Sequence, residues 1–184
     1  MRSQAYENHL DKTEAKWFAV YTRYKREKLV LADLERKGVE VYLPLQRLYK
    51  IYAKKKRLVE KPLFSCYLFV KITKEQFRIV QDTEGVVDFV SFARNLISIP
   101  KNEIEIVRRI VGENIEIDLE DQNYDAGDVV EVVSGSLSGL KGKLLDKKGK
   151  KNFLLQLNQI GYNLLIEINP KDIRKVDKKI VAVA

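Results

Sequence analysis

The stretch Gly127-Asp-Val-Val-Glu-Val-Val-Ser-Gly135-Ser-Leu-Ser-Gly139-Leu-Lys-Gly142-Lys-Leu144 holds the clearest pattern in the sequence. Valines alternate at 130 and 132, three glycines follow at spacings of four and three, and the alternation resumes at Leu144. Glycine is favoured where the backbone takes a positive φ or where two chain segments come close. The pattern therefore predicts a strand, a compact loop and a second strand. A phosphate-binding loop fits poorly, because a Walker loop needs Ser or Thr where Leu144 stands.

The same stretch resembles the KOW motif, the signature of a small SH3-like barrel found in transcription elongation factors and some ribosomal proteins. The resemblance rests on the glycines, on the opening Gly-Asp and on the flanking hydrophobic positions; the KOW loop glycines are Gly127, Gly135, Gly139 and Gly142. It implies an all-β domain over residues 126–179. An ordinary glycine-rich hairpin is the alternative.

Composition narrows the classes of function. The chain has 184 residues, which suits one or two domains, and its hydrophobic share of 45% is enough for a packed core. The formal net charge is +8 and the sequence pI is near 9.4. Such a balance favours polyanionic partners, nucleic acid first, although a basic soluble surface without a specific partner has the same composition.

Several chemistries lack the residues that they need. Cys66 is the single cysteine and His9 the single histidine, which excludes an intrachain disulfide and argues against zinc sites and histidine-based triads. No long apolar run indicates a membrane span or a signal sequence. We therefore expect a cytoplasmic, non-enzymatic protein without a metal or another cofactor. We also expect it to be a monomer.

The N-terminal part alternates strands and helices after a polar tail over residues 1–15. Residue patterns predict strands over 16–23, 39–43, 67–72 and 86–92, and helices over 25–37, 77–84 and 104–111. Between them, residues 47–61 predict an extended basic hairpin whose tip is Lys54–Arg57. The order suits an α+β domain with an antiparallel sheet over residues 16–112. The acidic segment 113–125 is predicted to be an inter-domain linker.

The predicted sheet has apolar residues on both faces. In the first strand, Trp17 and Tyr21 point one way while Phe18 and Val20 point the other. One layer of helices covers one face, so the other face would expose aromatic side chains, as interaction surfaces do. Alternatively, the third helix, the hairpin or the second domain covers that face.

Three further stretches extend the resemblance to the whole chain. They read Lys16-Trp-Phe-Ala-Val-Tyr-Thr22, Pro62-Leu-Phe-Ser-Cys-Tyr-Leu-Phe-Val70 and Thr83-Glu-Gly-Val-Val-Asp-Phe-Val90. With the KOW stretch they occur in the order found in NusG-type transcription factors. Over about residues 16 to 177, the chain resembles a specialised paralogue of the RfaH and UpxY kind.

The resemblance implies a function and a set of contact residues. Such factors bind the clamp helices of RNA polymerase through an aromatic sheet face, and suppress pausing or termination. By motif position, the polymerase-binding residues are Tyr21, Phe64, Tyr67, Phe69 and Phe92. Some members also touch the non-template DNA strand, and the basic candidates here are Arg23, Lys25, Arg26, Lys54, Lys55, Lys56 and Arg57. The KOW domain of such a factor recruits a ribosomal protein or a termination factor.

Two other readings stay open. Within the family, the chain could be a general housekeeping factor, although the basic hairpin favours a specialised one. Outside it, a KOW-containing RNA-binding or ribosome-associated protein would make stable contacts with ribosomal RNA. An aromatic sheet face favours a protein partner, whereas an RNA-binding face should be more basic.

Overall fold

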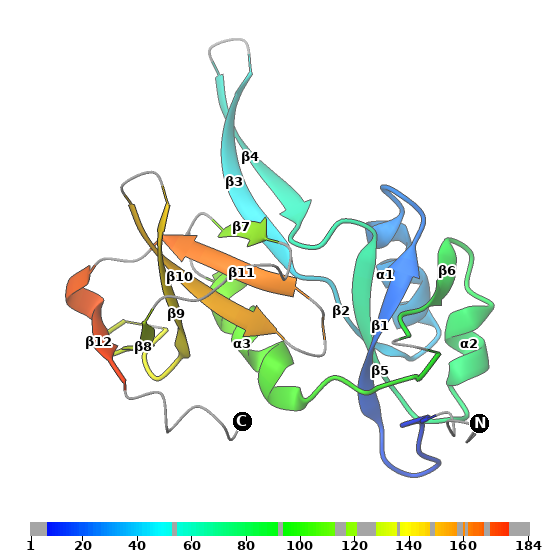
Figure 1. Cartoon of the computed structure of the whole chain (residues 1–184). Helices are drawn as coiled ribbons and strands as arrows, with labels where there is room; N and C mark the ends of the chain where they lie inside the picture. The colour runs from blue at the N-terminus through cyan, green and yellow to red at the C-terminus, as the bar shows by residue number, and fades with distance from the viewer. Residues whose placement is uncertain are drawn as a thin grey trace. The chain divides into compact units, whose positions relative to one another are not determined.

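The computed structural model describes residues 7–52, 55–91, 94–112, 117–120, 128–135, 137–147, 150–157, 160, 162–167 and 170–176. Contacts between residues divide the chain into two compact units, Met1–Val111 and Gly112–Ala184 (Figure 1). We call them the N-terminal and the C-terminal unit and describe each by itself.

A four-stranded antiparallel sheet forms the centre of the N-terminal unit. Its strands are β1 (Lys16–Thr22), β2 (Glu40–Tyr42), β5 (Tyr67–Ile72) and β6 (Val86–Phe89), in the order β2-β5-β1-β6. Along β1, Phe18 pairs with Val70 and Tyr21 pairs with Tyr67. The predicted strands are confirmed, with β6 ending three residues earlier than expected.

Two helices pack on one face of this sheet. They are α1 (Glu27–Arg36) and the short α2 (Phe77–Gln81). Their buried residues form one core with the inward side chains of the strands: Phe18, Val20, Val30, Leu34, Val39, Leu43, Leu68, Val70, Ile72, Val80 and Phe89. Gly38, with φ of +76°, ends α1 as predicted, because a left-handed residue at that place lets the next amide reach back to the helix.

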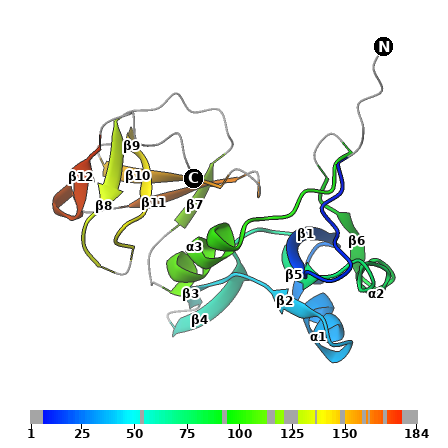
Figure 2. The same ribbon diagram turned by 90° about the horizontal axis from the view of Figure 1, so that it is seen from below.

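The third helix lies on the opposite face, as Figure 2 shows from below. This helix, α3 (Lys101–Gly112), buries Ile104, Val107 and Ile110. Its Arg108 guanidinium lies 5.5 Å from the centre of the Trp17 ring and 5.0 Å from that of Tyr42. The third helix therefore lies over the part of the aromatic face that holds Trp17 and Tyr42.

The basic hairpin is a separate two-stranded sheet that extends away from the main one (Figure 1). Strands β3 (Leu45–Tyr52) and β4 (Lys55–Pro62) pair along their whole length, from Leu45 opposite Pro62 to Tyr52 opposite Lys55. The predicted tip was wrong in part, because Lys55, Lys56 and Arg57 belong to β4 rather than to the turn. Lys54 lies outside the described residues.

The C-terminal unit is all-β. Its strands are β7 (Ile117–Glu120), β8 (Val129–Val132), β9 (Lys141–Lys147), β10 (Lys150–Leu157), β11 (Tyr162–Glu167) and β12 (Ile173–Lys175), and a 3-10 turn, η1, covers Pro170–Asp172. All neighbours are antiparallel, in the order β12-β8-β9-β10-β11-β7. Its buried side chains include Val130, Leu157, Leu164 and Ile166. The fold class is therefore confirmed: an α+β unit with an antiparallel sheet, followed by an all-β unit.

The predicted strand, loop and strand are confirmed in β8, the glycine-containing loop that follows it, and β9. Gly135 and Gly139 take φ of +72° and +86°, which glycine adopts without strain. The Gly139 amide donates to the Val132 carbonyl at 2.8 Å and closes the loop, and Gly142 lies opposite Val130 in the ladder. Gly127 lies outside the described residues.

One strand lies where the sequence predicted a linker. Residues 117–120 form β7, with Ile117 opposite Ile166 and Leu119 opposite Leu164. The two apolar residues alternate with Asp118 and Glu120. An apolar–polar pattern with a period of two residues is typical of a half-buried strand. Because the acidic composition was read as a linker signal, this short alternation was missed.

Candidate interaction surfaces

The turn after β1 is a basic and exposed feature beside the main sheet. We call residues Arg23–Arg26 the basic turn; all four, including Tyr24, are exposed. Lys25 takes a left-handed φ of +60°, and its ammonium lies 5.1 Å from the centre of the Tyr24 ring. An aromatic ring among cations combines a stacking surface with phosphate attraction, the two contributions that bind single-stranded nucleic acid. The sequence analysis did not select Tyr24 as a candidate, although this residue lies between Arg23 and Lys25.

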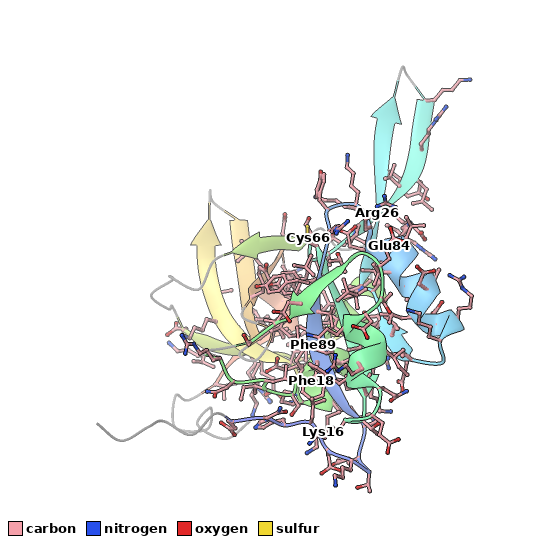
Figure 3. The ribbon with its side chains drawn as sticks, turned by 90° about the vertical axis from the view of Figure 1, so that its right-hand side faces the viewer. Lys16, Phe18, Arg26, Cys66, Glu84 and Phe89 are labelled. Carbon is pink, nitrogen blue, oxygen red and sulfur yellow. The ribbon has the colours of Figure 1, made fainter. Side chains whose placement is uncertain are left out.

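Neighbouring loops hold the basic turn in place. The Thr22 amide donates to the Cys66 carbonyl and the Arg23 amide to the Gly85 carbonyl, each at 2.8 Å. The buried Glu27 accepts a hydrogen bond from the Cys66 amide at 2.8 Å, which supports the left-handed φ of +64° at Cys66. Figure 3 shows Arg26, Cys66 and Glu84 at one end of the sheet and Lys16 at the other. The turn is therefore a fixed feature of the fold.

Gly85 offers a test of this support. It has φ of +90°, and a Cβ there would meet the Val30 side chain at 2.8 Å; Gly38 has a similar φ but open space around it. Gly38→Ala is expected to cost about 1–2 kcal/mol of unfolding free energy through backbone strain. Gly85→Ala should cost a further 1–3 kcal/mol or so, because Val30 is fully buried and cannot yield. Urea denaturation measures both, and equal losses would contradict the close approach at Gly85.

The sequence-predicted polymerase contacts are unequally accessible. Tyr21 is 38% exposed, Tyr67 is 8% exposed, and Phe64 and Phe69 are almost fully buried. The Tyr67 and Tyr21 hydroxyls lie 2.5 Å apart and their ring centres 4.5 Å apart. Thus Tyr21 offers most of the accessible surface among these four, with Tyr67 held beside it. Phe92 lies outside the described residues.

Phe64 and Phe69 belong to a packed aromatic layer instead. The Phe69 ring meets Phe64 edge to face at 5.8 Å and stacks on Tyr42 at 6.2 Å. Burial raises the pKa of Tyr42 above its ordinary value, although the nearby Arg108 acts in the opposite direction. The expectation that Phe64 and Phe69 themselves form an exposed surface is therefore wrong. Nothing in the sequence indicated that Arg108 would lie against this layer.

The root of the hairpin is joined to α1 by charged groups. Glu60 accepts from Lys28 at 3.2 Å and from Arg47 at 3.4 Å. The hydrogen bond from Lys28, followed by its charge and by Arg47, holds the pKa of Glu60 below its ordinary value. Because these groups are exposed, their ion pairs contribute little to the stability of the fold. Their main effect is to orient the hairpin relative to α1. Lys55 and Arg57, further along β4, are exposed and remain candidates for nucleic-acid contact, whereas the side chain of Lys56 is not described.

Two kinds of site are not seen in the described part of the chain. There, no group of three or more His, Cys, Asp and Glu residues could hold a metal ion. No helix among the described residues is long and apolar enough to cross a membrane.

A helix-flanked antiparallel sheet, a separate basic hairpin and an all-β unit form the arrangement that the resemblance to NusG-type transcription factors implies. The sequence matches the family model described as transcription termination factor nusG over residues 15–108, just over half of the chain. The chain therefore belongs to the NusG family.

Named relatives match over most of their length. The chain is 26% identical over 171 residues to the transcription termination/antitermination protein NusG of Streptococcus pyogenes, covering 86% of this chain and 95% of that protein. It is 22% identical over 173 residues to the protein of the same name from Rickettsia typhi, covering 88% and 90%. A solved structure of Thermotoga maritima NusG is similar with a TM-score of 0.56 and 19% identity, covering 89% of this chain and 98% of that one. At that identity the structure supports the fold alone.

Proposed function

We propose that this protein is a bacterial elongation and antitermination factor that binds the clamp helices of RNA polymerase and suppresses pausing or termination. The observation that carries the proposal is the NusG family match over residues 15–108, which spans the sheet, the Tyr21–Tyr67 pair and the basic turn. Coverage of 95% of a relative named for termination and antitermination supports the same role. A factor of this kind acts in the cytoplasm, as a monomer and without enzymatic chemistry.

The contact with polymerase centres on Tyr21. Tyr21 is more exposed than the other described candidates, which are Phe64, Tyr67 and Phe69. A half-exposed tyrosine offers a rigid ring and a hydroxyl to a partner. Tyr67 holds the ring in position through its hydroxyl, while Phe64 and Phe69 form the packed layer behind it. The role of the two buried phenylalanines is to set the shape of the surface.

We assign the contact with the non-template DNA strand to the basic turn. Arg23, Lys25 and Arg26 supply three cations, and Tyr24 supplies an exposed ring beside them. Phosphates are attracted without regard to sequence, and an unstacked base can lie on the tyrosine. The KOW unit is assigned the recruitment of a ribosomal protein or a termination factor, as in a specialised UpxY-like paralogue.

The test is binding of the full chain to purified core RNA polymerase. We expect a complex that survives size-exclusion chromatography and that is lost when the isolated clamp helices are added in excess. Failure to bind core polymerase, with the protein folded, would overturn the proposal.

The second candidate, an RNA-binding or ribosome-associated protein, has one observation in its favour. Lys147 and Lys150 lie directly opposite each other in β9 and β10, at the end of a lysine-rich hairpin. Two lysine positions that face each other in the backbone register suit a polyanionic partner. Co-sedimentation with ribosomes in preference to polymerase would favour this candidate.

A further inference from the structure

The β3–β4 hairpin differs from every other strand pair in the described structure, because it forms a sheet of two strands only. On one of its faces the cross-strand pair Tyr49 and Leu58 is 62% and 53% exposed. On the other face Lys55 and Arg57 are also exposed. A two-stranded ribbon of this kind is marginal by itself, and this one leaves both of its faces accessible.

The outer half of the ribbon is unusually cationic. Lys50 and Arg57 are directly opposite each other in the backbone register, so this cross-strand pair joins two cationic residue types. Such a pair destabilises a hairpin, and no acidic residue stands between positions 48 and 59 to offset it. Successive residues of a strand alternate between faces, so Lys55 and Arg57 lie on one face and Lys56 on the other. Cationic positions therefore fall on both faces of the ribbon in the backbone register.

These features suit binding inside a groove of a nucleic-acid duplex better than binding to single-stranded DNA. A single strand follows one surface, whereas a groove has a row of phosphates on each wall. The major groove of B-form DNA is about 12 Å wide and admits a two-stranded β-ribbon. Eight residues per strand span roughly 26 Å, which is enough for the outer half to enter while the root stays with the protein. The major groove of duplex RNA is too deep and narrow for this.

We propose that the β3–β4 ribbon enters the major groove of double-stranded DNA and holds its phosphates with Lys50, Lys55, Lys56 and Arg57. The inference rests on the proposed function only in that the protein works on DNA during transcription. It gives the ribbon and the basic turn different ligands, duplex DNA for the first and single-stranded DNA for the second. The contacts of Glu60 with Lys28 and Arg47 set the direction in which the ribbon leaves α1.

The test compares two DNA probes against the full-length protein. A 24-base-pair duplex and a 24-nucleotide single strand are titrated by fluorescence anisotropy over a series of salt concentrations. The ribbon variant replaces four cations by glutamine: Lys50→Gln, Lys55→Gln, Lys56→Gln and Arg57→Gln. Its duplex affinity should fall at least about tenfold, and the slope of log affinity against log salt should flatten by up to about 3.6 units, at roughly 0.9 for each phosphate contact. Its affinity for the single strand should stay within about twofold of wild type.

A second quadruple variant controls for net charge. It removes the same number of exposed cations from other parts of the N-terminal unit: Lys12→Gln, Lys74→Gln, Arg78→Gln and Lys101→Gln. The duplex affinity of this control should change by less than about threefold. An equal loss in both variants would show a general charge effect, and an equal loss of both probes in the ribbon variant would show a single-strand site. Either result would overturn the proposal.

Chemical protection identifies the groove. Dimethyl sulfate methylates guanine N7 in the major groove and adenine N3 in the minor groove. We expect the wild-type protein, but not the ribbon variant, to protect guanine N7 on the duplex. Protection of adenine N3 alone would overturn the assignment. Core polymerase binding is measured in parallel, so a failure of the proposed function is distinguishable from a failure of the ribbon assignment.

Discussion

Phe69→Asp is expected to unfold the N-terminal unit. The Phe69 side chain is fully buried between Phe64 and Tyr42, so the variant loses aromatic packing and places a carboxylate inside the fold. Loss of a buried phenylalanine costs about 3–5 kcal/mol, and an unpaired buried charge adds several kcal/mol more. The sum is comparable with the whole stability of an ordinary domain, about 5–15 kcal/mol.

Circular dichroism and urea denaturation of the purified variant measure this effect. Phe69→Leu is the matched control, because it keeps an apolar side chain of smaller volume and should leave the protein folded. A soluble, folded Phe69→Asp protein that loses less than about 1 kcal/mol would show that Phe69 is accessible after all. The packing of the aromatic layer would then be wrong.

Tyr21→Ala is expected to weaken the complex with core RNA polymerase without unfolding the protein. Truncating an aromatic anchor at the centre of an interface costs about 2 kcal/mol or more, which is roughly a thirtyfold loss of affinity. Because Tyr21 is half-exposed at the end of β1, its removal takes little from the core. Surface plasmon resonance with immobilised core polymerase measures the change in Kd.

Leu29→Ala is the control for that measurement. Leu29 is an exposed apolar residue on α1, the helix that packs on the other face of the sheet. We expect its Kd for polymerase to stay within about twofold of wild type. Equal losses for Tyr21→Ala and Leu29→Ala would indicate a general effect on the protein, and no loss for Tyr21→Ala would remove this residue from the interface.

Sequence reasoning succeeded where a local pattern determines the structure. The valine alternation and the glycines at 135 and 139 predicted β8, the loop and β9, because glycine is favoured where φ is positive. Gly38 likewise predicted the end of α1. The order of the strands and helices in the N-terminal unit followed from periodicity in the same way.

The remaining features depend on contacts between distant parts of the chain. The spacing of Ile104 and Val107 shows that α3 has an apolar side, but not which face of the sheet it covers. The bond between Glu27 and the Cys66 amide joins residues 39 positions apart, and no local pattern indicates it. In the segment that forms β7, the acidic composition led to the prediction of a linker, although Ile117 and Leu119 alternate with acidic residues as they do in a strand. In the hairpin, a run of four cations looked like a turn, although three of them continue a strand.

Single-round transcription with purified core polymerase on a template that carries a pause site and an intrinsic terminator tests the proposed role of the protein. With saturating wild-type protein, we expect shorter pauses and a larger run-off fraction than with polymerase alone. Tyr21→Ala at the same concentration should give less of this effect, and Leu29→Ala should match wild type. Unchanged pausing and termination with wild-type protein bound to polymerase would contradict the antitermination role, and an undiminished effect of Tyr21→Ala would contradict the assignment of its surface.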